Sequence, residues 1–171
     1  MNILPYIRTV PDYPIEGVNF YDLNSLFASD IWNKVVGEIA GNIAKKTEFP
    51  PTHIVGIESR GFVVGAAVAD ALNIPFVMIR KKGAKYPGKL LEESYELEYG
   101  TDTLTLQDGI LGHTSRVVIA DDLVATGGSF KASERLCEQA GATVLGGVTI
   151  INLKYLNKEN LELLFCVEID K

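Results

Sequence analysis

Apolar runs of strand length alternate with helically spaced apolar residues through most of this chain. Helical spacing predicts a helix over residues 30–46, and continuous apolar runs predict buried strands. The predicted order after that helix is strand 53–57, helix 62–72, strand 75–79, strand 116–120, a helix ending at Ala140, strand 142–151 and strand 165–169. This alternation predicts an α/β fold with a mostly parallel, doubly wound sheet, in which ligands bind at the carboxyl ends of the strands.

Three other segments complete this outline. Residues 1–10 are predicted to form a short amphipathic helix ended near Pro11, and Pro, Asp and Gly predict a loop over 11–17. Residues 157–163 are predicted to form a second short helix. The helix at 62–72 is apolar almost all round, which predicts that it is buried within the subunit or at an interface.

One strand-to-helix connection carries a chemical pattern, VVIADDLVATGGS at residues 117–129. Gly127 and Gly128 allow a backbone to approach an anion closely, and the following helix N-terminus favours negative charge. Thr126 and Ser129 add hydroxyl donors. Asp121 and Asp122 are unsuited to holding a phosphate, but they accept hydrogen bonds from a vicinal diol. Together these groups predict a site for a ribose 5-phosphate.

Two other interpretations of this stretch have to be weighed. A hydrophobic strand that ends in two acids is also found as a Walker B strand, but the GxxxxGK[ST] loop that accompanies it is absent from the sequence. The stretch could also be an ordinary strand, turn and helix in which the two glycines only make the turn.

The stretch resembles the binding signature of type I phosphoribosyltransferases, which use 5-phosphoribosyl-1-pyrophosphate (PRPP). The resemblance implies that Asp121, Asp122 and residues 125–129 (Ala125, Thr126, Gly127, Gly128 and Ser129) hold the ribose and phosphate. Glu58-Ser59-Arg60-Gly61-Phe62 is similar to the pyrophosphate loop of the adenine phosphoribosyltransferases, in which the first of these peptide bonds is cis. The forked guanidinium of Arg60 suits a phosphate, although an Arg at a helix start is by itself an ordinary surface residue.

Residues 80–109 interrupt the alternation with a long segment that begins with basic residues and continues with acidic ones. Alternating Tyr95, Leu97 and Tyr99, and then Leu104 and Leu106, predict the two arms of a hairpin. The basic part could be only a solvated loop. The segment is, however, similar to the mobile hood loop of the same family, which implies a lid and pyrophosphate contacts from Lys81 and Lys85. Residues 82–100 are one residue longer than that pattern, so the alignment of Lys85 is open.

The same resemblance implies a base pocket and a proton-handling acid. Glu98, in the YELEYG element, matches the glutamate that handles the purine proton, and we assign catalytic roles to Glu98 and Arg60. Adenine is expected to contact Asn19, Phe20 and Tyr21 of a small N-terminal hood (about residues 1–28) and Leu123. The family often has Arg at the position of Tyr21. By pattern alone, Phe20 is an ordinary core aromatic and Glu98 an ordinary surface acid.

Composition bounds the remaining possibilities. The 171 residues fit one domain, and the net charge of −6 argues against a nucleic-acid partner. The longest apolar runs are too short for a membrane span, so we expect a cytoplasmic protein with no membrane partner. Two Cys and two His residues form no metal pattern. The resemblance implies Mg2+ bound mainly through PRPP, with no metal-binding residues of the chain itself, and a homodimer.

These features predict a purine-salvage enzyme that converts adenine and PRPP to AMP and pyrophosphate. One alternative is the same chemistry on a 6-oxopurine such as hypoxanthine or xanthine. The other is a regulator that binds PRPP without reacting, although such proteins usually carry a nucleic-acid-binding element, for which this chain offers no spare segment.

Overall fold

The computed structural model describes residues 1–83, 85–97, 100–159 and 161–170. The chain forms two compact units, Met1–Glu38 and Ile39–Lys171. The first unit contains the 3-10 helix η1 (Leu4–Tyr6), the strands β1 (Arg8–Val10) and β2 (Phe20–Asp22) and the helix α1 (Asn24–Phe27). Helix α2 (Trp32–Lys46) begins in the first unit and ends in the second.

The predicted helix over residues 1–10 is wrong. Strand β1 pairs antiparallel with β2, and Arg8 lies opposite Asp22 while Val10 lies opposite Phe20. Helical spacing reports only local sequence, whereas this pairing depends on a partner strand that comes after the predicted loop at 11–17. Pro5 occupies the first turn of η1, where its missing N–H costs nothing.

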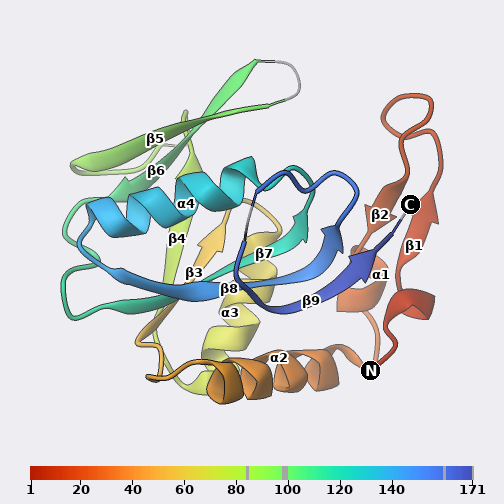
Figure 1. Cartoon of the computed structure of the whole chain (residues 1–171), viewed down its shortest axis with the longest axis horizontal. Coiled ribbons are helices and arrows are strands. Elements are labelled where there is room, and N and C mark those ends of the chain that lie inside the picture. The colour runs from red at the N-terminus through yellow and green to blue at the C-terminus, as the bar shows by residue number, and fades with distance from the viewer. Residues whose placement is uncertain (84, 98–99, 160, 171) are drawn as a thin grey trace. The chain divides into compact units, whose positions relative to one another are not determined.

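The second unit is built on one sheet whose strands lie in the order β5-β6-β4-β3-β7-β8-β9. Its elements are β3 (His53–Ile57), α3 (Gly61–Leu72), β4 (Phe76–Lys81), β5 (Leu90–Glu96), β6 (Thr101–Gln107), β7 (Arg116–Val124), α4 (Gly128–Gln139), β8 (Thr143–Leu153) and β9 (Leu163–Ile169). Strands β4, β3, β7, β8 and β9 are parallel, while the hairpin β5–β6 joins β4 antiparallel. The predicted doubly wound α/β fold is confirmed (Figure 1).

The two crossover helices of this unit lie on opposite faces of the sheet (Figure 1). The chain moves from β3 to β4 in one direction along the sheet and from β7 to β8 in the other, and right-handed crossovers then require opposite faces. Glycines allow both helices to pack closely. A Cβ on Gly65 of α3 would lie 2.6 Å from the Phe76 ring, and one on Gly147 of β8 would lie 1.8 Å from the Phe130 ring of α4.

Two other expectations about helices have different outcomes. Helix α3 buries one face against the described part of the chain, but Val63 is 44% exposed and Ala66 is also exposed, so burial of the other face at an interface stays a prediction. The predicted helix over 157–163 is wrong, because its described residues form irregular chain and Leu163 already begins β9. The backbone N–H of Lys158 bonds instead to the carbonyl of Thr126, a tertiary contact that local periodicity does not reveal.

Helix α2 offers a simple test of the helix assignment. Gly37 is exposed in its interior, and a Cβ there would meet nothing within 4 Å. We therefore expect Gly37→Ala to raise the free energy of unfolding by roughly 0.5–1 kcal/mol, because alanine loses less backbone entropy in a helix. Urea unfolding monitored by circular dichroism measures this change, and a destabilised variant would contradict the helix environment described here.

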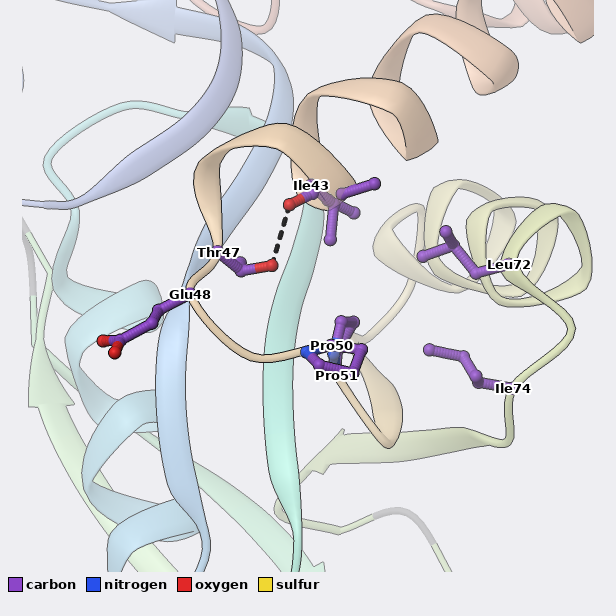
Figure 2. A pocket seen from close by; sticks show the side chains of 8 residues that line it. Ile43, Thr47, Glu48, Pro50, Pro51, Leu72 and Ile74 are labelled. Carbon is purple, nitrogen blue, oxygen red and sulfur yellow. Dashed lines mark hydrogen bonds between the residues drawn. The ribbon is translucent and has the colours of Figure 1, made fainter.

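An apolar cavity of about 260 Å³ lies at the opposite end of the second unit from the carboxyl ends of the strands. Figure 2 shows it between the end of α2 and the segments that lead into β3 and β4, with Ile43, Pro51, Leu72 and Ile74 in its wall. Glu48 is the only titratable residue among its described lining residues, which therefore offer no paired acid and base. None of the helices in the described part of the chain is long and apolar enough to cross a bilayer.

Candidate functional site

The parallel strands β3 and β7 are neighbours, and the strand order reverses between them. In open α/β sheets a crevice forms where the chain leaves two such strands toward opposite faces. The segments that follow β3 and β7 are the two stretches singled out in the sequence. They touch at Gly61, where a Cβ would lie 2.8 Å from the carbonyl oxygen of Ala120 and 2.9 Å from Oδ1 of Asp121.

The two acids lie inside β7 rather than after it. The strand continues to Val124 because β8 pairs with it throughout, with Asp121 opposite Thr149 and Val124 opposite Asn152. Asp121 is only 9% exposed and Asp122 only 4%. The backbone N–H of Asp122 donates to Oδ1 of Asp121 at 2.9 Å, which fixes the Asp121 carboxylate against the strand backbone.

Arg60 reaches across from the β3 side to this acidic pair. Its Nε lies 2.9 Å from Oδ2 of Asp122, an ion-pair distance. Oδ2 is nevertheless buried without a hydrogen bond from the described residues. We regard the contact as electrostatic, and Oδ2 as an acceptor suited to an alcohol donor from a ligand.

Burial dominates the electrostatics of the pair. Burial and the adjacent charge of Asp122 hold the pKa of Asp121 well above its usual range. Burial also raises the pKa of Asp122, against the opposing effect of the Arg60 guanidinium. Low-dielectric surroundings favour the neutral acid, and a neighbouring cation favours the carboxylate. The site therefore holds two acids whose charge depends on what lies next to them.

The turn after β7 has the geometry of an anion cradle. Gly127 has φ +90°, a conformation that favours glycine, and provides the N-cap of α4 without a side-chain hydrogen bond. The first-turn N–H groups of α4 are thus left for an anion. Gly127 is buried, and Ala125, Thr126, Gly128 and Ser129 are half-buried. The side chains of Asn157 and Glu159 pack against the turn. A Cβ on Gly127 would lie 2.8 Å from the Glu159 side chain and 3.0 Å from Oδ1 of Asn157.

The stem of the β5–β6 hairpin is part of the core. Leu104 and Leu106 are fully buried, and the side chains of Arg135 and Gln139 on α4 both donate to the Glu93 carboxylate on β5. A cavity of about 450 Å³ lies between this stem and the first turns of α4. The prediction of two extended arms is confirmed by β5 and β6, although β5 ends before Leu97 and Tyr99 lies outside the described residues. The stem packs against α4.

Tyr95 links the stem to the anion cradle. Its ring packs against Gly128, where a Cβ would lie 3.3 Å from Cδ2, and its hydroxyl donates to Oδ2 of Asp102 at 3.3 Å. Burial, together with the charges of Asp102 and Asp121, raises the pKa of Tyr95 to about 12. Sequence alternation predicted an extended arm that contains Tyr95, but nothing in the sequence pointed to Gly128 as its neighbour.

The pyrophosphate loop and the basic segment meet through Glu58. Its carboxylate accepts hydrogen bonds from Arg80 Nε at 3.3 Å and from the backbone N–H of Lys81 at 2.9 Å. Burial favours the neutral acid, but these donors outweigh it and lower the pKa of Glu58. The peptide bond between Glu58 and Ser59 is cis, which confirms the expectation from the resemblance. Sequence analysis missed this role of Glu58.

The predicted pyrophosphate residues lie in different settings. Ser59 and Arg60 are exposed at the end of β3. Lys81 ends β4, and its Nζ lies 3.6 Å from Oδ2 of Asp102. Lys85 is exposed in the segment between β4 and β5. The structure therefore brings Ser59, Arg60 and the start of the basic segment to the same edge of the sheet, while the role of Lys85 stays a prediction.

The predicted base-binding residues belong to both units. In the first unit, Phe20 and Tyr21 form part of β2, Asn19 directly precedes it, and the Phe20 ring makes an edge contact with Tyr13 at 5.2 Å. In the second unit, Leu123 is half-buried near the end of β7. Glu98 lies outside the described residues, so its catalytic role stays a prediction. In the part of the chain that the structure describes, no three His, Cys, Asp or Glu side chains are grouped to bind a metal ion.

Comparisons with known proteins agree with this geometry. Residues 23–163 match the model of the phosphoribosyl transferase domain family. The chain is 46% identical over 157 residues to the adenine phosphoribosyltransferase of Rhodospirillum rubrum, covering 91% of this chain and 90% of the relative. It is 43% identical over 159 residues to that of Acetivibrio thermocellus, covering 92% and 91%.

Solved structures of adenine phosphoribosyltransferases share the fold. The enzyme of Thermoanaerobacter pseudethanolicus superposes with a TM-score of 0.87 at 32% identity, covering 97% of this chain and 96% of that one. The Saccharomyces cerevisiae enzyme, in complex with an imino-altritol bisphosphate and adenine, gives 0.86 at 33% identity, covering 95% and 96%. The Trypanosoma brucei enzyme, in complex with AMP, pyrophosphate and ribose-5-phosphate, gives 0.83 at 27% identity, covering 96% and 76%.

Proposed function

This chain belongs to the adenine phosphoribosyltransferases, a branch of the type I phosphoribosyltransferase family, and we propose how its own residues perform the family's reaction. The reaction converts adenine and PRPP to AMP and pyrophosphate, a step of purine salvage. The observation that carries the residue assignment is the buried pair Asp121 and Asp122, which lies between the Arg60 loop and the start of α4.

PRPP is proposed to lie along the edge formed by these elements. Its 5-phosphate occupies the cradle of residues 125–129, where backbone N–H groups and two hydroxyls donate to it. Asp121 and Asp122 accept hydrogen bonds from the ribose diol, and the orphan Oδ2 of Asp122 gains a donor. Ser59, Arg60, Lys81 and Lys85 hold the pyrophosphate.

Replacement of pyrophosphate by adenine at ribose C1 requires stabilisation of the negative charge on the leaving pyrophosphate and of the electron-poor ribose. As the pyrophosphate leaves, Arg60 and the loop lysines stabilise its growing negative charge, while the two acids fix the sugar that becomes electron-poor. Adenine must lose a ring proton as its nitrogen bonds to C1, and Glu98 is proposed to accept or relay that proton. Arg60 and Glu98 are therefore the two catalytic residues of the proposal.

Mg2+ is proposed as the cofactor; it would be held mainly by PRPP rather than by side chains of this chain, and would supply charge neutralisation for the leaving pyrophosphate. The donor set of the chain fits this arrangement, since Asp121 and Asp122 are buried and committed to the diol. A homodimer is also proposed, and exposed apolar residues of α3, among them Val63, are candidates for its interface. A cytoplasmic location remains the prediction made from the sequence.

Turnover of different purines tests the proposed function. Purified protein with PRPP and Mg2+ is expected to form AMP from adenine and to turn over hypoxanthine, xanthine and guanine far more slowly. Preferred turnover of a 6-oxopurine would favour the first alternative activity. PRPP binding without turnover of any purine would favour a regulator.

The adenine contacts can be tested inside the first unit. Phe20→Ala is expected to raise KM for adenine roughly 5- to 150-fold, because base–aromatic stacking is worth about 1–3 kcal/mol. The KM for PRPP should stay within about twofold, since the ring is assigned no PRPP contact. Initial-rate kinetics with each substrate varied in turn measures both values. An equal rise in both KM values would argue against a base-specific role, and Phe49→Ala, an exposed phenylalanine elsewhere, is the matched control.

A further inference from the structure

The contact between Arg60 and Asp122 joins two parts of the site that the proposed function treats separately. Arg60 is assigned to the pyrophosphate and Asp122 to the ribose diol, yet Nε and Oδ2 lie 2.9 Å apart. The carboxylate is almost fully buried, whereas the Arg60 side chain is 43% exposed. The guanidinium is therefore the cation at the solvent side of a buried acidic pair.

A buried carboxylate pair of this kind needs a positive partner to stay ionised. Burial favours the neutral form of each acid, and the charge of Asp122 raises the pKa of Asp121 further, while the Arg60 guanidinium lowers the pKa of both acids. Among the described residues, the charged and titratable groups that act on the pair are Arg60, from the start of α3, and Tyr95, from the hairpin stem. Burial raises the pKa of Tyr95 to about 12, so Arg60 is the cation of these two groups at neutral pH.

We propose that Arg60 has a second task, as the positioning residue that favours the ionised form of the Asp121–Asp122 pair and orients it to receive the ribose diol. This inference rests on the proposed function, because it takes the diol as the ligand of the pair. It extends that function, because Arg60 then governs the binding of nucleotides that carry no pyrophosphate. Neutral carboxyls accept hydrogen bonds from alcohols more weakly than carboxylates do, so the effect reaches AMP as well as PRPP.

AMP separates the two tasks of Arg60, because it contains the ribose and the 5-phosphate but lacks the pyrophosphate. We expect Arg60→Gln to weaken AMP binding about tenfold or more at pH 7, and the loss to shrink as the pH rises and the acids ionise without help. Isothermal titration calorimetry between pH 5 and 9, in buffers of different ionisation enthalpy, gives the affinity and the protons exchanged. Arg60→Lys keeps the charge and should recover part of the affinity.

Two further variants make the test specific. Asp122→Asn should remove the dependence of AMP affinity on Arg60, so that adding Arg60→Gln to it causes little further loss. Arg116→Gln removes the same charge from the far end of β7, where its Nε donates to the Pro50 carbonyl, and should leave AMP affinity unchanged. Circular dichroism checks that each variant is folded.

The inference is overturned if Arg60→Gln, folded, binds AMP within about twofold of the wild type across the pH range while its KM for PRPP rises. That outcome would restrict Arg60 to the pyrophosphate. If Arg60→Gln weakens AMP binding as expected but the wild-type protein forms no AMP from adenine and PRPP, the inference is supported and the proposed reaction is overturned. The inference is also overturned if Arg60→Gln and Arg116→Gln lower the affinity for AMP equally, because the effect would then not be specific to the acidic pair.

Discussion

The double variant Asp121→Asn, Asp122→Asn is expected to lose roughly a hundredfold to ten-thousandfold in kcat/KM for PRPP. Each carboxylate is proposed to accept a charge-assisted hydrogen bond from the diol, and such a bond is worth about 1.5–3 kcal/mol. Asparagine has a similar size but a weaker acceptor and no charge. Initial rates of AMP formation measure the loss, and Asp70→Asn, Asp170→Asn removes the same formal charge from exposed positions as a control.

The same variant is expected to be as stable as the wild type at pH 7, or more so. The folded-state pKa of Asp121 is raised, so the folded protein binds more protons than the unfolded chain between about pH 4, the usual value for Asp, and that raised pKa. Wild-type stability therefore contains a contribution that is present at low pH and is lost as the pH rises through this window. Urea unfolding at several pH values measures it, and the variant should show a flatter profile. A variant that keeps full activity would refute the diol assignment.

Gly61→Ala is expected to damage both stability and activity. Alanine normally favours a helical position, but here its Cβ would lie 2.8 Å from the Ala120 carbonyl oxygen and 2.9 Å from Oδ1 of Asp121. A backbone carbonyl in the middle of a sheet moves little, so the start of α3 must shift away from β7. We expect a loss of roughly 1–3 kcal/mol in the free energy of unfolding, as for other overpacked sites.

The functional effect of Gly61→Ala should exceed what reduced stability explains. The start of α3 carries Arg60 next to the acidic pair, so a shifted helix separates groups that must act together. We expect kcat/KM for PRPP to fall about tenfold or more at a temperature where the variant is fully folded, since small misplacements in a site are costly. Gly37→Ala, where a Cβ meets nothing, is the control. Unchanged kinetics would show that the two loops do not depend on this close approach.

The sequence predicted the second unit well because its signals are local. The apolar run that became β3 was predicted at its observed bounds, and the turn chemistry of Gly127 and Gly128 marked the start of α4. The first ten residues were misassigned because β1 exists through its pairing with β2. The acids were expected just beyond a strand, whereas pairing with β8 extends β7 through both of them.

The contacts that connect the site could not be read from the sequence. The Arg60–Asp122 and Glu58–Arg80 pairs join residues that are distant along the chain and become neighbours only when the strand order brings β3 between β4 and β7. Their residue types gave no signal, because isolated Arg and Glu residues are ordinarily solvated. Such pairs depend on topology, which periodicity alone does not determine.

Strand β7 lies between β3 and β8 and is hydrogen-bonded on both sides, and its residues from Val117 to Ala120 have no exposed surface. Backbone amides in such a strand exchange with solvent only when the whole unit opens, whereas less packed parts open locally at lower free energy. The carboxylates proposed to bind the ribose therefore lie in a part of the molecule that unfolds only with the whole unit. Denaturant that merely loosens peripheral segments will leave them in register, and their loss will coincide with global unfolding.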